Sequence, residues 1–130
     1  MTLTLIIEGS AIQDIPSFYA ELNRVFMAGE DWSLGESLDA LDDLLHGGFG
    51  ALAGHEAATI VWRDLDASRR ALGLVATRAW LQHKIARPDI FNSAAMQARL
   101  DALERGSGQT YFAMVEAIFR SHPRLQLVAT

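Results

Sequence analysis

Apolar residues recur along this chain in two periods, one of two residues and one of between three and four. Near the start, Leu3, Leu5 and Ile7 occupy every second position, which is typical of a half-buried strand. Between residues 15 and 27 the apolar side chains recur at i, i+4, i+7 and i+8, which predicts an amphipathic helix. Continued along the chain, the period of two predicts strands at residues 2–8, 57–62 and 125–128. The longer period predicts helices at residues 15–27, over about ten residues after Ser37, from Asp64 or Asp66 to Leu72, at residues 74–86, from Asn92 or Ser93 onward, and from Thr110 to Pro123.

Residues that begin and end helices fall at the boundaries of these segments. Asp14, Ser37 and Thr110 suit the N-cap position, because their side-chain oxygens can accept a backbone N–H. Gly47 follows the second helix, and glycine readily adopts the left-handed conformation of a C-cap. Strands separated by helices favour a parallel sheet. We therefore expect an α/β fold, with a small three-stranded parallel sheet packed with helices, in one domain over residues 1–130.

The composition excludes several classes of protein. Half of the 130 residues are apolar, which is too many for a disordered chain, and the net charge of −5 lacks the basic footprint that nucleic-acid binding needs. The absence of cysteine excludes disulfides, thiol catalysis and cysteine zinc sites. The apolar run at the N-terminus ends at Glu8, too early for a signal peptide or a membrane span. We expect a cytoplasmic protein with no membrane contact, and a monomer, although the sequence leaves the oligomeric state open.

Acidic residues dominate one continuous stretch of the chain, since no lysine or arginine occurs between Arg24 and Arg63. The stretch contains Glu30, Asp31, Glu36, Asp39, Asp42, Asp43 and Glu56. Three of these aspartates crowd the predicted helix after Ser37, where like charges at i, i+3 and i, i+4 cost about 0.2–0.5 kcal/mol per pair. A patch of one sign, kept at this cost, predicts a surface that meets a basic protein, and in particular one that handles phosphates.

Paired carboxylates can also serve general acid and base catalysis, but no nucleophile or metal-ligand motif accompanies them here. The four histidines (His46, His55, His83 and His122) are scattered, and none falls at metal-ligand spacing. The glycines at residues 47–50 lack a phosphate-loop lysine and the spacing of a dinucleotide-binding loop. We therefore expect no enzymatic activity, no cofactor and no metal ion.

Two segments of the chain resemble the barstar family of ribonuclease inhibitors. Residues 35–45, Gly-Glu-Ser-Leu-Asp-Ala-Leu-Asp-Asp-Leu-Leu, are similar to the family's G-E-N-L-D-A-L-x-D-x-L run. Residues 61–68, Val-Trp-Arg-Asp-Leu-Asp-Ala-Ser, resemble the end of its second strand and the start of its next helix. The resemblance covers about residues 1–72 and 109–130. It implies a small α/β domain that inhibits a basic ribonuclease, or a related nuclease toxin, before the enzyme leaves the producing cell.

The resemblance also implies which residues contact the enzyme. Family members insert the acidic helix and the preceding loop into the basic cleft of the ribonuclease. Asp43 matches their principal carboxylate, a phosphate mimic in the enzyme's phosphate-binding position, and Asp39 matches the second carboxylate. Gly35 matches the loop glycine, while His46 and Gly47 match contacts at the helix end. The predicted partner-binding residues are Trp32, Ser33, Leu34, Gly35, Glu36, Asp39, Asp42, Asp43, His46, Gly47 and Phe49.

The chain departs from the founding member of the family at its aromatic contacts. Ser33, Asp42 and Gly48 stand where that protein has aromatic residues. Aromatic anchors usually carry much of the energy of an interface. We expect Trp32 and Phe49 to supply them here from shifted positions.

A helical insertion at about residues 73–108 has no counterpart in the founding member. It carries Trp80, which is either part of a small core of the insertion or an exposed anchor. An alternative hypothesis is therefore a regulatory or scaffolding module of the same fold, whose partner docks on the insertion. A third possibility is self-association through exposed apolar residues of the insertion.

Overall fold

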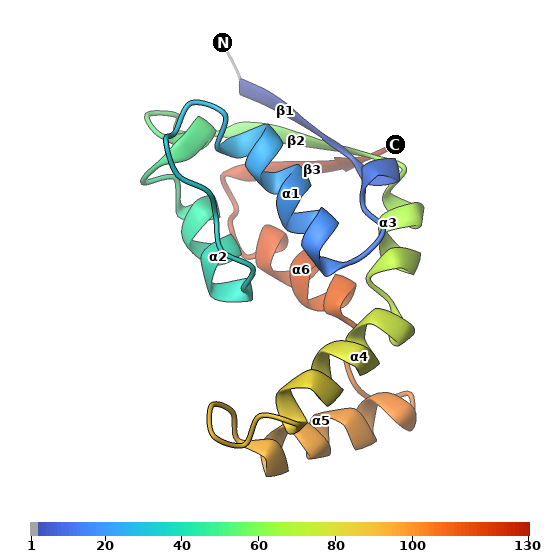
Figure 1. Ribbon diagram of the computed structural model, residues 1–130. Coiled ribbons are helices and arrows are strands. Elements are labelled where there is room, and N and C mark those ends of the chain that lie inside the picture. Colours follow the sequence, from blue (N-terminus) through green and yellow to red (C-terminus); the bar gives the residue numbers. More distant parts are fainter. Residues whose placement is uncertain (1–2) are drawn as a thin grey trace.

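A three-stranded sheet lies along one side of the molecule in the computed structural model, which describes residues 3–130 (Figure 1). Its strands are β1 (Leu3–Glu8), β2 (Ala58–Arg63) and β3 (Leu125–Ala129). They run parallel in the order β1-β2-β3, with Leu5 opposite Ile60 and Ile60 opposite Leu127. The predicted α/β class and the parallel sheet are confirmed. The first residue of the predicted strand at residues 2–8 lies outside the described residues.

The helices follow the order that the apolar pattern predicts. They are η1 (Gly9–Ala11), α1 (Ile15–Phe26), α2 (Leu38–His46), η2 (Gly50–Leu52), α3 (Leu65–Ala71), α4 (Leu74–Ile85), α5 (Ser93–Glu104) and α6 (Tyr111–Arg120), where η marks a single 3₁₀ turn. Asp14, Ser37 and Thr110 cap α1, α2 and α6 through their side chains, as expected. Asp64 precedes α3 but makes no capping bond through its side chain. It adopts a left-handed φ of 50°, and its carbonyl oxygen accepts the N–H of Ala67 at 3.0 Å.

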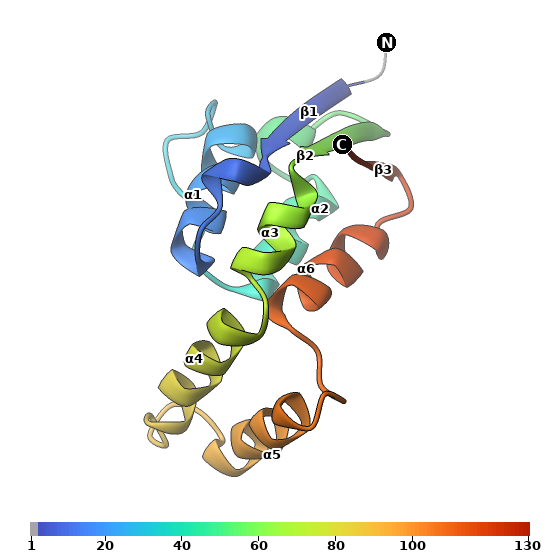
Figure 2. The ribbon, with the colours of Figure 1, turned by 90° about the vertical axis from the view of Figure 1, so that its right-hand side faces the viewer.

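The helices cover one face of the sheet. In β2, Ala58, Ile60 and Trp62 point toward the helices and are buried, whereas Thr59 and Val61 face the other way and are partly exposed. Figures 1 and 2 agree with this arrangement, since α1, α2 and α6 lie on the same side of the strands in both views. The fold is therefore a two-layer α/β structure.

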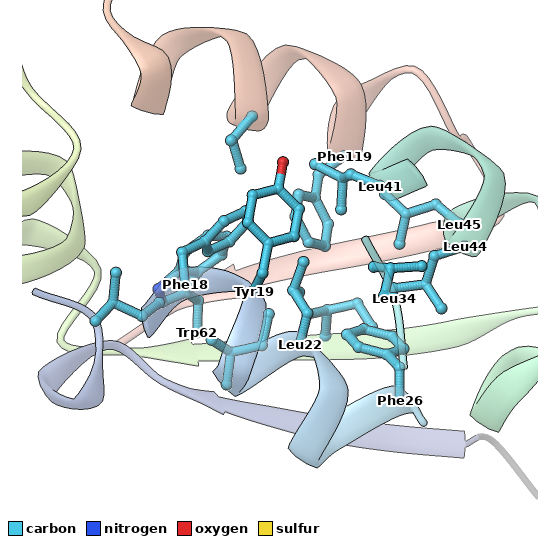
Figure 3. Close-up of a cluster of buried hydrophobic side chains, with 14 of the residues drawn as sticks. Phe18, Tyr19, Leu22, Phe26, Leu34, Leu41, Leu44, Leu45, Trp62 and Phe119 are labelled. Atoms are coloured by element: carbon cyan, nitrogen blue, oxygen red, sulfur yellow. The ribbon is translucent and has the colours of Figure 1, made fainter. Parts of the chain in front are cut away.

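The core between the layers is centred on Trp62, the last buried residue of β2 (Figure 3). The Trp62 ring stacks on Phe18 with centroids 6.2 Å apart and meets Phe119 edge-on at 5.4 Å. Its Nε1 donates a hydrogen bond to Ser68 Oγ at 3.0 Å, and that hydroxyl donates to the carbonyl oxygen of Gly9 at 3.3 Å. Trp62 is thus a core residue whose polar atom has a partner, as buried tryptophans usually require.

A buried carboxylate ties α1 to the end of β1. Glu21 is 4% exposed, accepts the backbone N–H of Glu8 at 2.7 Å, and accepts two hydrogen bonds from Arg24 at 2.7 and 2.6 Å. Burial by itself would raise the pKa of Glu21, but the hydrogen bonds from Arg24 and from the Glu8 backbone outweigh it. The net result is a pKa below the ordinary value of a glutamate.

The insertion is a pair of helices, α4 and α5, that projects away from the sheet in both views (Figures 1 and 2). Leu81 and Leu103 are buried, and Arg78 Nε pairs with Glu104 Oε1 at 2.5 Å across the two helices. The partly buried Trp80 ring meets Tyr111 of α6 edge-on at 5.0 Å. Trp80 therefore joins the insertion to the rest of the core while keeping part of its surface exposed.

The insertion begins and ends at neighbouring points of the fold. The N–H of Phe112 donates to the carbonyl oxygen of Leu72 at 3.0 Å. The fully buried Thr77 accepts the N–H of Tyr111 on Oγ1 at 2.7 Å and donates to the carbonyl oxygen of Gly73 at the same distance. These bonds hold the start of α4 against the start of α6.

Candidate partner-binding surface

Helix α2 presents its aspartates outward because its leucines are needed in the core. Leu41, Leu44 and Leu45 are fully buried, and this stripe places Asp39 and Asp43 on the opposite, exposed face. The predicted division of the helix into an apolar and an acidic face is confirmed. The two carboxylates lie one turn apart, at i and i+4, so they form a single negative patch.

Asp43 has an exposed side chain that a partner can reach. Within residues 3–130 it makes neither a side-chain hydrogen bond nor an ion pair, and the same is true of Asp39. Asp43 lies in the last turn of α2, where a negative charge meets the negative end of the helix dipole. Its carboxylate is therefore unfavourable for the isolated helix and accessible from solvent.

Asp42 differs from its two neighbours because it has partners inside the fold. Its Oδ1 lies 2.8 Å from Nε2 of His122, which sits on the turn between α6 and β3. Its Oδ2 lies 3.8 Å from Nδ1 of His46, and that nitrogen is 2.8 Å from the Asp42 carbonyl oxygen. The structure thus separates the three aspartates of α2 into two exposed carboxylates and one that contacts the chain itself.

The loop before α2 is held in place by Asn23 of α1. The side chain of Asn23 accepts the N–H of Leu34 on Oδ1 at 2.6 Å and donates to the Leu34 carbonyl oxygen at 3.4 Å. The Leu34 side chain is buried in the core, although Leu34 is one of the predicted partner-binding residues. Its side chain therefore anchors the loop, and Ser33, Gly35 and Glu36 on either side of it are exposed.

The two aromatic residues expected to act as anchors lie side by side. The rings of Trp32 and Phe49 have centroids 4.9 Å apart and are tilted by 51°. Trp32 is 46% exposed and donates from Nε1 to Glu30 Oε2 at 3.2 Å. Residues 17 positions apart in sequence thus form one aromatic pair in the loops that flank the acidic helix, with Trp32 exposed and Phe49 partly buried.

The C-terminal end of α2 is fixed by a glycine and an arginine. Gly47 adopts the left-handed conformation with φ of 81°, and its N–H donates to the Leu44 carbonyl oxygen at 3.1 Å. A Cβ at this position would collide with the guanidinium of Arg124. That guanidinium donates to the carbonyl oxygens of Leu45 and His55 at 3.1 and 3.0 Å. Gly47 and His46 are therefore placed by contacts with the segment that leads into β3.

A groove of about 570 Å³ lies between the N-terminal end of α2 and the insertion. Glu36 and Asp39 line one side, and Trp80, Lys84 and Arg99 line the other. Lys84 Nζ lies 4.3 Å from the centroid of the Trp80 ring, and Arg99 lies 5.3 Å from it. Burial and the nearby charge of Arg99 lower the pKa of Lys84 against the opposing effect of Asp39. The insertion thus adds a basic and aromatic wall beside the acidic surface, and leaves Asp39 and Asp43 exposed.

A comparison with known protein families matches the part of the chain that contains this surface. The model of the family described as Barstar (barnase inhibitor) matches residues 2–95, which include the whole acidic helix and the loop before it. The chain belongs to the barstar family. The family is one of inhibitors and not of enzymes, and its members bind ribonucleases of the barnase type. The match extends through α4 and into the start of α5, so the barstar model spans about the first two thirds of the insertion as well.

Two further findings accompany the family match. No curated protein is similar enough to this chain to count as a match. Among the helices of residues 3–130, none has both the length and the apolar character that crossing a bilayer requires.

Three residues that shape this barstar surface carry no signal in the sequence. Asn23 lies on the polar side of α1, Arg124 follows a proline, and His122 is one of four scattered histidines. Each of the three contacts a residue far away in the sequence, at a separation that the periodicity of a helix or a strand does not predict. Their roles therefore become visible through the packing of α1, α2 and α6.

Proposed function

We propose that this barstar-family chain inhibits a basic ribonuclease by placing its acidic helix in the enzyme's active site. The observation that carries the proposal is the exposed pair Asp39 and Asp43, which lie one turn apart without an ion-pair partner in the described chain. An active site that binds RNA phosphates is positively charged. Asp43 would occupy a phosphate position, and Asp39 would add a second carboxylate one turn away.

The surroundings of the two carboxylates support the same reading. The Trp32–Phe49 pair, in which Trp32 is exposed and Phe49 partly buried, offers an aromatic contact area in the loops that flank the acidic helix, as the centres of tight interfaces often do. Asn23 and Leu34 hold the loop that carries Trp32, so little order would have to be gained on binding. The negative patch would also steer a basic enzyme toward the surface and raise the association rate at low salt.

The test is a titration of the purified protein against a small basic ribonuclease of the barnase type. RNA cleavage is followed at low and at physiological salt. We expect stoichiometric 1:1 inhibition that weakens as salt rises and is lost in the Asp43→Ala variant. Inhibition that ignores salt, or that survives Asp43→Ala unchanged, would contradict the active-site plug.

A second candidate function is a scaffolding module that docks its partner on the insertion. The observation in its favour is that Leu74, Val75 and Ile90 are exposed on or beside α4, with Val75 at 75%. The Asp39→Ala/Asp43→Ala double variant and a deletion of residues 74–107 separate the two proposals. Loss of partner binding in the deletion alone would favour docking on the insertion, and light scattering of the intact chain would reveal self-association through the same residues.

A further inference from the structure

Three potential metal ligands meet at the C-terminal end of α2. Asp42 and His46 lie one turn apart on this helix, and His122 reaches them from the turn between α6 and β3. One ligand atom from each residue can be chosen so that all three atoms lie within 4.8 Å of one another. The rings of His46 and His122 meet edge-on at an angle of 88° with centroids 4.8 Å apart. Two histidines 76 positions apart are thus brought against the same carboxylate.

We propose that Asp42, His46 and His122 form a binding site for a divalent transition-metal ion, with Zn²⁺ as the best fit. Two imidazole nitrogens and one carboxylate oxygen are a donor set that zinc accepts readily. Magnesium and calcium prefer sites made of oxygen ligands alone, so this set discriminates against them. Three protein ligands leave a fourth position of a tetrahedral ion open to water or to a group from another molecule.

The present spacing is close to what such an ion needs. Zinc bonds of about 2.0–2.2 Å in a tetrahedron place the ligand atoms about 3.3–3.6 Å apart. The Asp42 carboxylate is 2.8 Å from His122 Nε2 and 3.8 Å from His46 Nδ1, which lie on either side of that value. All three ligand atoms lie within 4.8 Å of one another, so the widest separation exceeds this range by at most about 1.2–1.5 Å. A rotation of the exposed His46 side chain, which would give up the contact of Nδ1 with the Asp42 carbonyl oxygen at 2.8 Å, would bring the three ligands together.

The two histidines have complementary freedom for this adjustment. The His122 side chain is 9% exposed and is fixed by its surroundings, so it provides a preset ligand. The His46 side chain is 64% exposed and can turn about its own bonds to complete the set. Asp42, at 44% exposure, joins the two and keeps one side of the site open to solvent.

The charge around the site favours a cation. Asp43 is adjacent in sequence, and the C-terminal end of α2 carries the negative end of the helix dipole. Arg124 also lies at this end, but its guanidinium is taken up by the carbonyl oxygens of Leu45 and His55. A hydrogen bond between Asp42 and His122 alone would require no second histidine, whereas the edge-on approach of His46 supplies the third ligand.

The experiment is a titration of the full-length chain, with any purification tag removed, using Zn²⁺ and, as a spectroscopic probe, Co²⁺. We expect saturable binding of one ion per chain, visible absorption of Co²⁺ in a site of low coordination number, and a rise in the melting temperature with added Zn²⁺. Loss of a second-shell partner commonly weakens a metal site about 10–100-fold, and loss of a ligand weakens it at least as much. His46→Ala should therefore bind Zn²⁺ at least about tenfold more weakly.

The controls keep the proposal falsifiable if one variant folds poorly. His46 is exposed, so its substitution tests the site without disturbing the core, and Asp42→Asn gives a second test. His55→Ala removes another exposed histidine outside the cluster and should leave binding unchanged, and Mg²⁺ should not compete with Zn²⁺. Absence of saturable binding, or unchanged affinity in both His46→Ala and Asp42→Asn, would overturn the proposal. This outcome is independent of whether the chain inhibits a ribonuclease.

Discussion

Substitution of Asp43 by asparagine should raise the stability of the free protein while it removes inhibition. Asp43 repels Asp39 across one turn of α2, which costs about 0.2–0.5 kcal/mol. It also opposes the negative end of the helix dipole, which costs typically about 0.3–1 kcal/mol for an exposed charge. No bond within residues 3–130 offsets these two terms. We therefore expect Asp43→Asn to gain about 0.5–1.5 kcal/mol in the free energy of unfolding.

The same change should act in the opposite direction on the complex. Loss of one partner from a buried charge pair generally costs a protein complex about 2–5 kcal/mol, a range to which barnase with barstar itself contributes. Since about 1.4 kcal/mol is a factor of ten, inhibition should weaken by about 30-fold to several thousandfold. A residue that only holds the fold together would lower stability and inhibition together. Opposite signs of the two effects therefore identify a residue that serves the partner.

The assay measures both quantities on the same protein preparations. Unfolding by urea gives the stability, and titration of a barnase-type ribonuclease at two salt concentrations gives the inhibition. Glu56→Gln is the matched control, because Glu56 is an exposed acid of the same stretch that lies off α2. It changes the net charge equally and should alter neither quantity appreciably. A loss of more than about 1 kcal/mol in the stability of Asp43→Asn, or inhibition equal to that of the unmodified chain, would contradict a role of Asp43 in binding the partner.

Three further predictions concern the scaffold. Because hydrogen bonds hold the pKa of Glu21 below its usual value, its contribution to stability is complete above about pH 4.5 and is lost as the pH falls through the lowered pKa. Urea unfolding from pH 7 to 3 should show this loss of stability, and Glu21→Gln should reduce the dependence of stability on pH. Thr77→Val should cost about 1–3 kcal/mol, because it leaves the buried N–H of Tyr111 without an acceptor, and Thr77→Ser should retain that bond; equal stability of the valine variant would exclude the proposed role. Gly47→Ala should cost about 1–2 kcal/mol in thermal unfolding through its left-handed backbone, and an unchanged melting temperature would contradict this.

The main elements of the fold could be predicted because local patterns determine them. In α2 the leucine spacing, the cap Ser37 and the terminal Gly47 agree on one helix, and the structure has this helix with those ends. The outward direction of Asp39 and Asp43 follows from the same leucine stripe. A helix whose period, cap and termination all agree leaves little for tertiary packing to decide.

The rest of the surface depends on contacts between distant segments, which no local pattern contains. Asp42 and His122 are 80 positions apart, and their contact exists because α2 and α6 pack together. Leu34 lies in an irregular loop, where a single apolar residue has no period to show which way it faces, and it proves to be buried. The sequence predicts a shared role for Trp32 and Phe49 but not their contact, since the contact requires the two loops around α2 to converge.

The two ends of the insertion have a consequence for how the protein can vary. The backbones of Leu72 and Phe112 are joined by a hydrogen bond of 3.0 Å, so the insertion leaves the α/β core and returns to it at neighbouring points (Figure 2). Loop closure costs only about 0.6 kcal/mol for each doubling of the loop length, so the number of residues between these two points matters little for chain entropy. The insertion between these two points could therefore be shortened, replaced by another helical pair or fused to a reporter domain. Such changes would alter the groove beside Asp39 but would leave the caps and the buried leucines of α2 in place.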